Sequence, residues 1–138
     1  MMLDENKVIE TMIEYLQANG YDINGQCSTS QSGIDIEAQH RETKEKYFIE
    51  AKGATSSKSS SALYGQPFNK NQIKVHIGVA LVQVFTLYER FHKMNAKIGI
   101  ALPDNENHRK IISSMRTQVI NSKIDIFFVS ENNVELYR

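Results

Sequence analysis

Two apolar segments that carry charged residues constrain the fold of this chain most strongly. They are residues 34–36 and 48–53, and the short polar turn 41–45 joins the two strands to which they belong. Side chains alternate between the two faces of a strand, so a hairpin centred on this turn sets Asp35 beside Glu50 or Lys52 on a common face. The sequence therefore predicts that two carboxylates and an ammonium group converge.

These three residue types fit phosphoryl chemistry. Magnesium takes oxygen ligands and is usually held by one or two carboxylates together with substrate phosphate oxygens. We therefore expect Asp35, Glu50 and the backbone carbonyl of Ala51 to bind Mg²⁺ or Mn²⁺, which would polarise a phosphoryl oxygen and activate a water molecule. Lys52, one side-chain period beyond Glu50, would orient that water or offset charge on the scissile phosphate.

The alternative is an amphipathic hairpin whose outer face carries ordinary solvated Asp, Glu and Lys side chains. The apolar run Tyr47-Phe48-Ile49, however, leads directly into Glu50 and is typical of a strand buried on both faces. Charged side chains are rarely buried in such a strand unless they are paired or functional, because burial of an unpaired charge is unfavourable. We therefore favour a chemical site.

The spacing of apolar residues predicts the order helix, three strands, helix, strand, helix, strand. We expect helices at 4–18, 69–92 and 105–120, strands at 21–28, 33–39, 46–52, 96–102 and 124–130, and a short last strand after Asn132-Asn133. The second helix should bury one apolar face that includes Phe85. An antiparallel meander followed by parallel crossovers gives a single α/β domain, residues 1–138, with a mixed central sheet flanked by helices.

Asp35, Glu50 and Lys52 in this order of elements resemble the core of the PD-(D/E)xK nuclease superfamily, the restriction-endonuclease-like fold. Gly33-Ile34 stands before Asp35 where the named motif has proline, a position that many members relax to Gly-x-Asp. The resemblance covers nearly the whole chain. It implies metal-dependent hydrolysis of phosphodiester bonds in DNA, and many small nucleases of this fold act as homodimers.

The resemblance also suggests two further site residues. Several branches of the superfamily place a Gln just after the Glu-x-Lys strand, and Gln72 stands in a comparable place, with Gln66 as the competing choice. A Glu of the first helix often serves as an extra metal ligand. Glu5 is the best-placed candidate because it aligns with the buried stripe of that helix, whereas Glu14 points the opposite way. A first-turn Gln and an exposed Glu are also common without any such role.

Charge is unevenly distributed although the formal net charge is 0. Residues 1–51 hold ten acidic and four basic side chains, and residues 53–103 hold one acidic and six basic side chains. The second stretch is typical of a surface that faces a polyanion. We expect contacts with DNA from four of its residues: Lys58, Lys70, Lys74 and His76.

Other kinds of site have little support. Cys27 is the only cysteine, so an internal disulfide is excluded and a buried bystander thiol is expected. The four histidines lack zinc-ligand spacing, and no Ser-His-Asp pattern occurs. No apolar run approaches the roughly 20 residues that span a bilayer, and the polar start is unlike a secretory signal, so we expect a cytoplasmic protein with no membrane partner.

These observations predict a metal-dependent DNA endonuclease. A domain this small has little room for a target-recognition module, so cutting guided by DNA structure or by a partner is favoured over sequence-specific cutting. Two alternatives stay open: a Holliday-junction resolvase-like enzyme, which shares the fold and motif, and a non-catalytic nucleic-acid-binding subunit that retains the fold. Loss of an acid or of the Lys would mark the latter, and all three are present.

Overall fold

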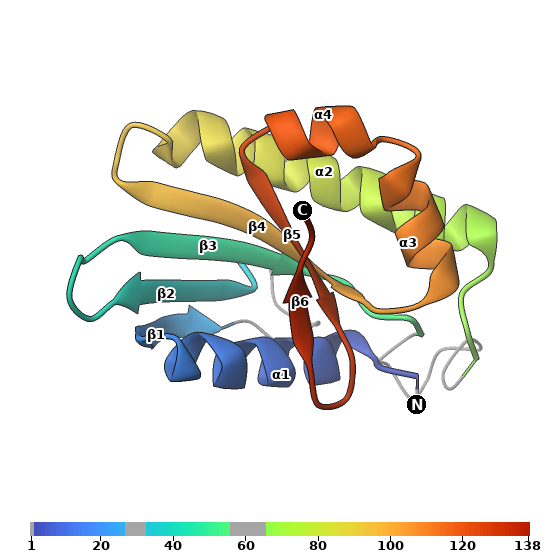
Figure 1. Ribbon diagram of the computed structural model, residues 1–138, viewed down its shortest axis with the longest axis horizontal. Coiled ribbons are helices and arrows are strands. Elements are labelled where there is room, and N and C mark those ends of the chain that lie inside the picture. The colour runs from blue at the N-terminus through green and yellow to red at the C-terminus, as the bar shows by residue number, and fades with distance from the viewer. Residues whose placement is uncertain (1, 27–32, 56–65) are drawn as a thin grey trace.

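A six-stranded open sheet between two layers of helices forms the part of the chain that the computed structural model describes, residues 2–26, 33–55 and 66–138 (Figure 1). The helices are α1 (Glu5–Ala18), α2 (Lys70–Phe91), α3 (Glu106–Ser113) and α4 (Arg116–Asn121). The strands are β1 (Tyr21–Gln26), β2 (Ile36–His40), β3 (Lys46–Ala51), β4 (Ala96–Pro103), β5 (Ile124–Val129) and β6 (Val134–Leu136).

The strands lie in the sheet in sequence order. β1, β2 and β3 form an antiparallel meander, β4 and β5 continue it in parallel, and β6 returns antiparallel to β5. The predicted α/β class and mixed sheet are thus confirmed. Ile36 pairs with Ile49 at the end of the β2–β3 ladder, so the register continued by one residue sets Asp35 opposite Glu50.

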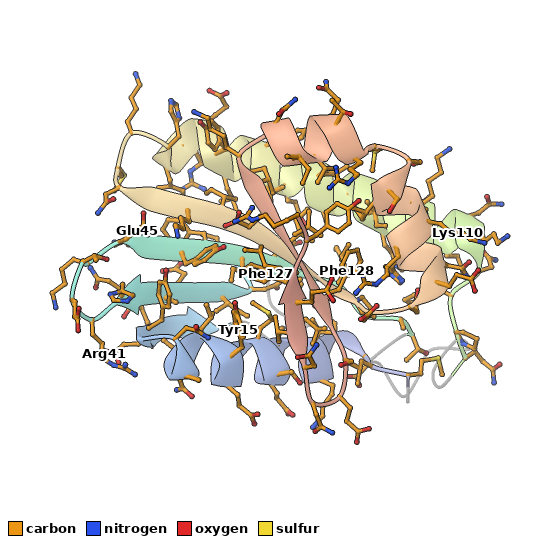
Figure 2. The ribbon with its side chains drawn as sticks, in the orientation of Figure 1. Tyr15, Arg41, Glu45, Lys110, Phe127 and Phe128 are labelled. Carbon is orange, nitrogen blue, oxygen red and sulfur yellow. The ribbon has the colours of Figure 1, made fainter. Side chains whose placement is uncertain are left out.

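Each face of the sheet has its own apolar core, because alternate side chains of every strand point to opposite faces. On one face α1 packs through a buried stripe, and Tyr15 of α1 lies against Phe127 of β5 with ring centroids 5.8 Å apart (Figure 2). On the other face α2, α3 and α4 cover side chains such as Phe48 and Phe128. None of the helices in these described segments is long and apolar enough to cross a membrane.

The predicted helix at 105–120 is wrong as a single element. The structure breaks it into α3 and α4 at Ser114 and Met115, and Met115 leaves the helical conformation with φ −120° and ψ 21°. The Ser114 hydroxyl donates a hydrogen bond to the carbonyl of Ile111 at 2.6 Å. Serine side chains compete in this way for backbone groups, which favours a helix end over a helix interior.

Phe85 also departs from prediction. The buried face of α2 consists of Ile73, Ile77, Ala80, Val84 and Leu87, whereas the Phe85 side chain is 49% exposed. At about 100° per residue, Phe85 lies well outside the arc that these five residues define. Apolar residues therefore occupy both the inner and the outer side of α2.

The start of α1 is held directly against the end of β3. Ala54 donates its backbone N–H to the carbonyl of Leu3 at 2.7 Å, and Asp4 forms a parallel bridge with Thr55. A Cβ at Gly53 would lie 2.3 Å from the backbone nitrogen of Glu5. Only glycine leaves room for this approach, so the residue after Glu-x-Lys determines where α1 begins.

We predict that Gly53→Ala destabilises the fold by about 1–3 kcal/mol or more, because the new methyl group overlaps backbone that cannot move without displacing α1. Thermal unfolding followed by circular dichroism measures the effect. Gly25→Ala is the matched control, since a Cβ there meets nothing within 4 Å. Equal melting temperatures for the two variants would contradict this account of the α1–β3 contact.

Candidate active site

The end of β3 brings the predicted hairpin residues together. Glu50 and Lys52 leave β3 toward the α2 face, because Ile49 and Ala51 point into the core beneath α1. Asp35 stands one residue before β2 and is 7% exposed, and Glu50 is 5% exposed. The β2–β3 turn, marked by Arg41 and Glu45 in Figure 2, lies at the opposite end of these strands. The site thus occupies the carboxyl end of β3.

Asp35 is tied to the backbone of the Glu-x-Lys segment. Its Oδ2 accepts a hydrogen bond from the backbone N–H of Ala51 at 2.8 Å. The N–H and C=O groups of one strand residue point to the same side of the strand, so the Ala51 carbonyl is directed toward the Asp35 side. Gly33 enters this segment with φ 124°, a conformation that favours glycine.

Glu5 is the third carboxylate of the site. It is the first residue of α1, and the contact of its backbone with Gly53 brings it to the end of β3. Its charge interacts with Asp35 and Lys52, whereas Glu10 and Glu14 lie exposed farther along the helix. The structure therefore brings Glu5, and not Glu14, to the predicted hairpin residues.

Burial makes ionisation of Glu50 and Glu5 unfavourable. Burial, a hydrogen bond with Asp35 and the Asp35 charge raise the pKa of Glu50 to about 8, against a partial lowering by Lys52. Burial and the Asp35 charge raise the pKa of Glu5 to about 7. Without a cation, the folded protein therefore keeps protons on this cluster near neutral pH.

Lys52 supplies positive charge at the rim of the cluster. Its Nζ lies 3.7 Å from Oε2 of Glu50, and its side chain is 18% exposed against 7% for Glu50. The ammonium group is thus partly accessible while the carboxylate beside it is buried. This arrangement leaves Lys52 able to meet a ligand that approaches from outside.

His76 is the α2 residue that the structure relates to this cluster. Its ring packs edge-on against Phe68 with centroids 4.4 Å apart, and burial together with the Lys52 charge lowers its pKa below the usual value. His108 of α3 is 1% exposed and its Nε2 has no hydrogen-bond partner among the described residues. Burial and His76 lower the pKa of His108 to about 4, so both imidazoles are neutral at pH 7.

Gln72 has a structural role in this arrangement. Its Oε1 accepts a hydrogen bond from the backbone N–H of Asn69 at 2.8 Å, and Asn69 Oδ1 accepts one from the backbone N–H of Gln72 at 2.9 Å. This capping box secures the start of α2. Within the described segments the Gln72 side chain is hydrogen-bonded to Asn69 and not to the carboxylates, and Gln66 lies exposed.

The predicted DNA-contacting lysines are not gathered at the carboxylates. Lys70 and Lys74 are exposed on the first turns of α2, and Lys70 is near enough to Glu106 of α3 to help lower the pKa of that carboxyl. Lys58 and Cys27, the latter predicted to be a buried bystander thiol, lie outside the described residues. Contact of any of these lysines with DNA stays a prediction.

The donor set suits a hard cation. Across residues 2–26, 33–55 and 66–138, no group of three His, Cys, Asp or Glu side chains is already arranged as metal ligands. Magnesium needs fewer protein ligands than this, because waters and substrate phosphates complete its shell. Burial, with a further contribution from the Asp35 charge, raises the pKa values of Glu5 and Glu50 when no cation is present. The residues therefore fit a divalent ion bound by oxygen atoms.

A cleft of about 540 Å³ lies beside the site at the same edge of the sheet. Leu3 and Ala54 line it together with the ends of β4 and β5, so it adjoins the α1–β3 contact. Its acidic lining residues, Asp104 and Glu131, do not favour a phosphate chain, although Arg109 neutralises Asp104 through two hydrogen bonds of 2.6 and 3.0 Å. The cleft does not contain the carboxylate cluster itself.

Comparisons with family models, curated proteins and solved structures gave no match to this chain. The assignment of a function therefore depends on the geometry of the cluster and on the resemblance of its motif.

Two features of the site were missed in the sequence. One is the role of Gly53, whose missing side chain lets the backbone of Glu5 approach β3. The glycine directly after Glu-x-Lys was its visible signal in the sequence. The proximity of His108 to His76 was also missed, because these residues stand on different helices and no spacing rule relates them.

We predict that Glu50→Gln gains stability relative to wild type as pH rises from 5 to 8 in metal-free buffer. Glu50 and Glu5 have raised pKa values, so the folded protein binds more protons than the unfolded chain and loses stability as pH rises through this range. The buried His108 acts in the opposite direction at acid pH, because its pKa is lowered.

The measured quantity is therefore the difference in melting temperature between Glu50→Gln and wild type at each pH. Glu10→Gln, an exposed position on α1, is the control and should show no trend. A constant difference from pH 5 to 8 would mean that Glu50 titrates normally in the folded protein.

Proposed function

We propose that this protein is a metal-dependent deoxyribonuclease that hydrolyses phosphodiester bonds with Asp35, Glu50 and Lys52. The observation that carries the proposal is the carboxylate cluster at the end of β3, in which Asp35 and Glu50 are buried, Glu5 is half-buried and Lys52 lies at the rim. Strongly perturbed carboxyl groups of this kind concentrate at functional sites. DNA as the substrate, and the restriction-endonuclease-like fold in particular, come from the resemblance of the motif.

Each residue has a chemical role in this proposal. Asp35, Glu50, Glu5 and the Ala51 carbonyl would hold Mg²⁺ or Mn²⁺, which when bound supplies charge to the phosphate and lowers the pKa of water. Glu50 must release its proton for the site to be filled, so metal binding weakens as pH falls. Lys52 would offset the negative charge that develops on the phosphate or position the attacking water.

Burial and the Lys52 charge lower the pKa of His76, which supports a position for this residue on the side of α2 toward the carboxylate cluster. A neutral imidazole next to the ammonium group can accept a hydrogen bond from a water molecule or from Lys52 itself. We therefore keep His76 as a residue that faces the substrate. Gln72 has less support, because its side-chain oxygen is already engaged in the α2 capping box.

The first test of the function is metal binding. We predict that titration with Mn²⁺, followed by calorimetry at pH 8, detects a site that Asp35→Asn and Glu50→Gln each weaken at least tenfold, because both remove an oxygen ligand charge. Glu5→Gln should weaken binding less, since Glu5 is the additional ligand. Proton release that increases as the buffer pH is lowered toward 7 would accompany binding.

Glu14→Gln is the matched control, as an acid on the same helix that lies exposed away from the cluster. Equal affinities for wild type, Asp35→Asn and Glu50→Gln would remove the basis for a metal site at this position.

The second test concerns the chemical step. We predict that Lys52→Ala binds metal and DNA nearly as wild type does but cleaves DNA about 10²-fold to 10⁴-fold more slowly, because it removes only the group that acts during the reaction. Single-turnover cleavage measured beside DNA affinity separates these effects. Lys46→Ala, on the same face at the start of β3, should cleave normally. Cleavage by Lys52→Ala at the wild-type rate would exclude Lys52 from the mechanism.

The same assay distinguishes the alternatives when linear, nicked and four-way DNA are compared. A preference for four-way junctions with paired cuts would favour a Holliday-junction resolvase-like enzyme. Tight DNA binding without cleavage of any of the three, in the presence of Mg²⁺ or Mn²⁺, would favour a non-catalytic nucleic-acid-binding subunit.

A further inference from the structure

The outward side of α2 carries apolar side chains that the rest of the described chain covers only in part. Val75, Val79, Val82 and Phe85 are 62%, 45%, 67% and 49% exposed. Their spacing of four, three and three residues places them on one stripe of the helix. At about 100° per residue, Val82 points almost directly away from the buried side of α2.

The helix is therefore apolar on both sides. Its inner side already packs on the sheet. The exposed outer stripe therefore adds little to the folding stability of a single chain. A helix that is apolar all round is normally buried on all sides, and a contiguous exposed apolar stripe marks an interaction surface.

Gly78 lies within this stripe. A Cβ built there meets nothing within 4 Å, so the surrounding space is open. Glycine in the interior of a helix lowers its stability relative to alanine, and nothing within this chain requires its small size. Close approach of a side chain from another molecule would use the open space.

We propose that α2 pairs antiparallel with α2 of a second copy of this chain, with a two-fold axis close to Val82. On the helix surface, Gly78 and Phe85 lie to the same side of Val82, one turn before it and one turn after it. A two-fold axis perpendicular to both helices sets Phe85 of each copy over Gly78 of the other. The missing side chain at Gly78 thus leaves room for the Phe85 ring of the other copy.

Charge supports the same register. Glu89 is the acidic residue of α2, and it lies exposed on the same side of the stripe as Lys74. Residues 74 and 89 lie about equally far from the two-fold axis on its two sides, as residues 78 and 85 do, so both pairs are related by the same axis. Lys74 of one copy therefore meets Glu89 of the other, and the pair occurs twice because the interface is isologous.

This inference does not depend on the proposed cleavage activity. It gives Lys74 a protein partner in place of a DNA phosphate, and it leaves His76 on the other side of α2 free to face the carboxylate cluster. A dimer formed in this way carries two copies of the cluster in a fixed relation.

The test is the oligomeric state of the full chain without metal or DNA, measured by analytical ultracentrifugation over a range of concentrations. We expect a concentration-dependent dimer that Val82→Glu converts to monomer. Val82 is mostly exposed within one chain, so this variant should keep its fold by circular dichroism. Gln83→Glu, an exposed position on α2 outside the stripe, is the control and should dimerise as wild type does.

Two further variants test the register. Lys74→Glu and Glu89→Lys should each weaken dimerisation at least tenfold by creating two like-charge pairs, and the double variant should restore it to within a few-fold of wild type. Gly78→Leu should raise the melting temperature of the monomer through better helix propensity and yet weaken the dimer, because the leucine fills the seat of Phe85.

A wild-type protein that stays monomeric at about 100 μM would overturn the proposal, because a specific interface is expected to bind more tightly than this. A dimer that survives both Val82→Glu and Gly78→Leu would also overturn it, since the interface would then lie on another surface.

Discussion

The close contact between Gly53 and the backbone of Asp4 and Glu5 is the constraint on which the site depends. It joins the first turn of α1 to the end of β3, although α1 covers the opposite face of the sheet from Glu50 and Lys52. A side chain at residue 53 would separate the two segments. Because residue 53 has none, Glu5 reaches around the strand end and completes a cluster of three carboxylates.

That cluster is unfavourable by itself. Two buried acids lie near the half-buried Glu5, and burial together with the Asp35 charge raises the pKa values of Glu5 and Glu50. The surrounding structure holds them there through rigid backbone, notably the hydrogen bond from Ala51 to Asp35. Carboxyl groups held together at a cost in folding stability are typical of a site arranged for a charged ligand. A divalent cation would relieve the repulsion between them.

α2 contributes to both the carboxylate cluster and the proposed dimer interface, through different sides of the helix. Its inner side packs on Phe48 and the parallel strands and presents His76 near Lys52. Its outer side carries Val82, Phe85 and the open surface at Gly78. One helix can therefore present His76 on one side and the proposed subunit contact on the other without either role disturbing the other.

Much of this fold and part of the site could be predicted from the sequence, because they depend on local periodicity. Alternation along residues 47–52 determined that Glu50 and Lys52 share a face, and the order of apolar segments determined the mixed sheet. The break between α3 and α4 and the capping role of Gln72 could not be predicted, because they depend on which backbone group a polar side chain binds. Tertiary structure alone decided that the start of α1 contacts the end of β3, which brings the candidate Glu5 near Asp35, and that Phe85 faces outward. Such contacts depend on how elements pack in three dimensions, and a pattern of spacing along the chain carries no information about packing between distant elements.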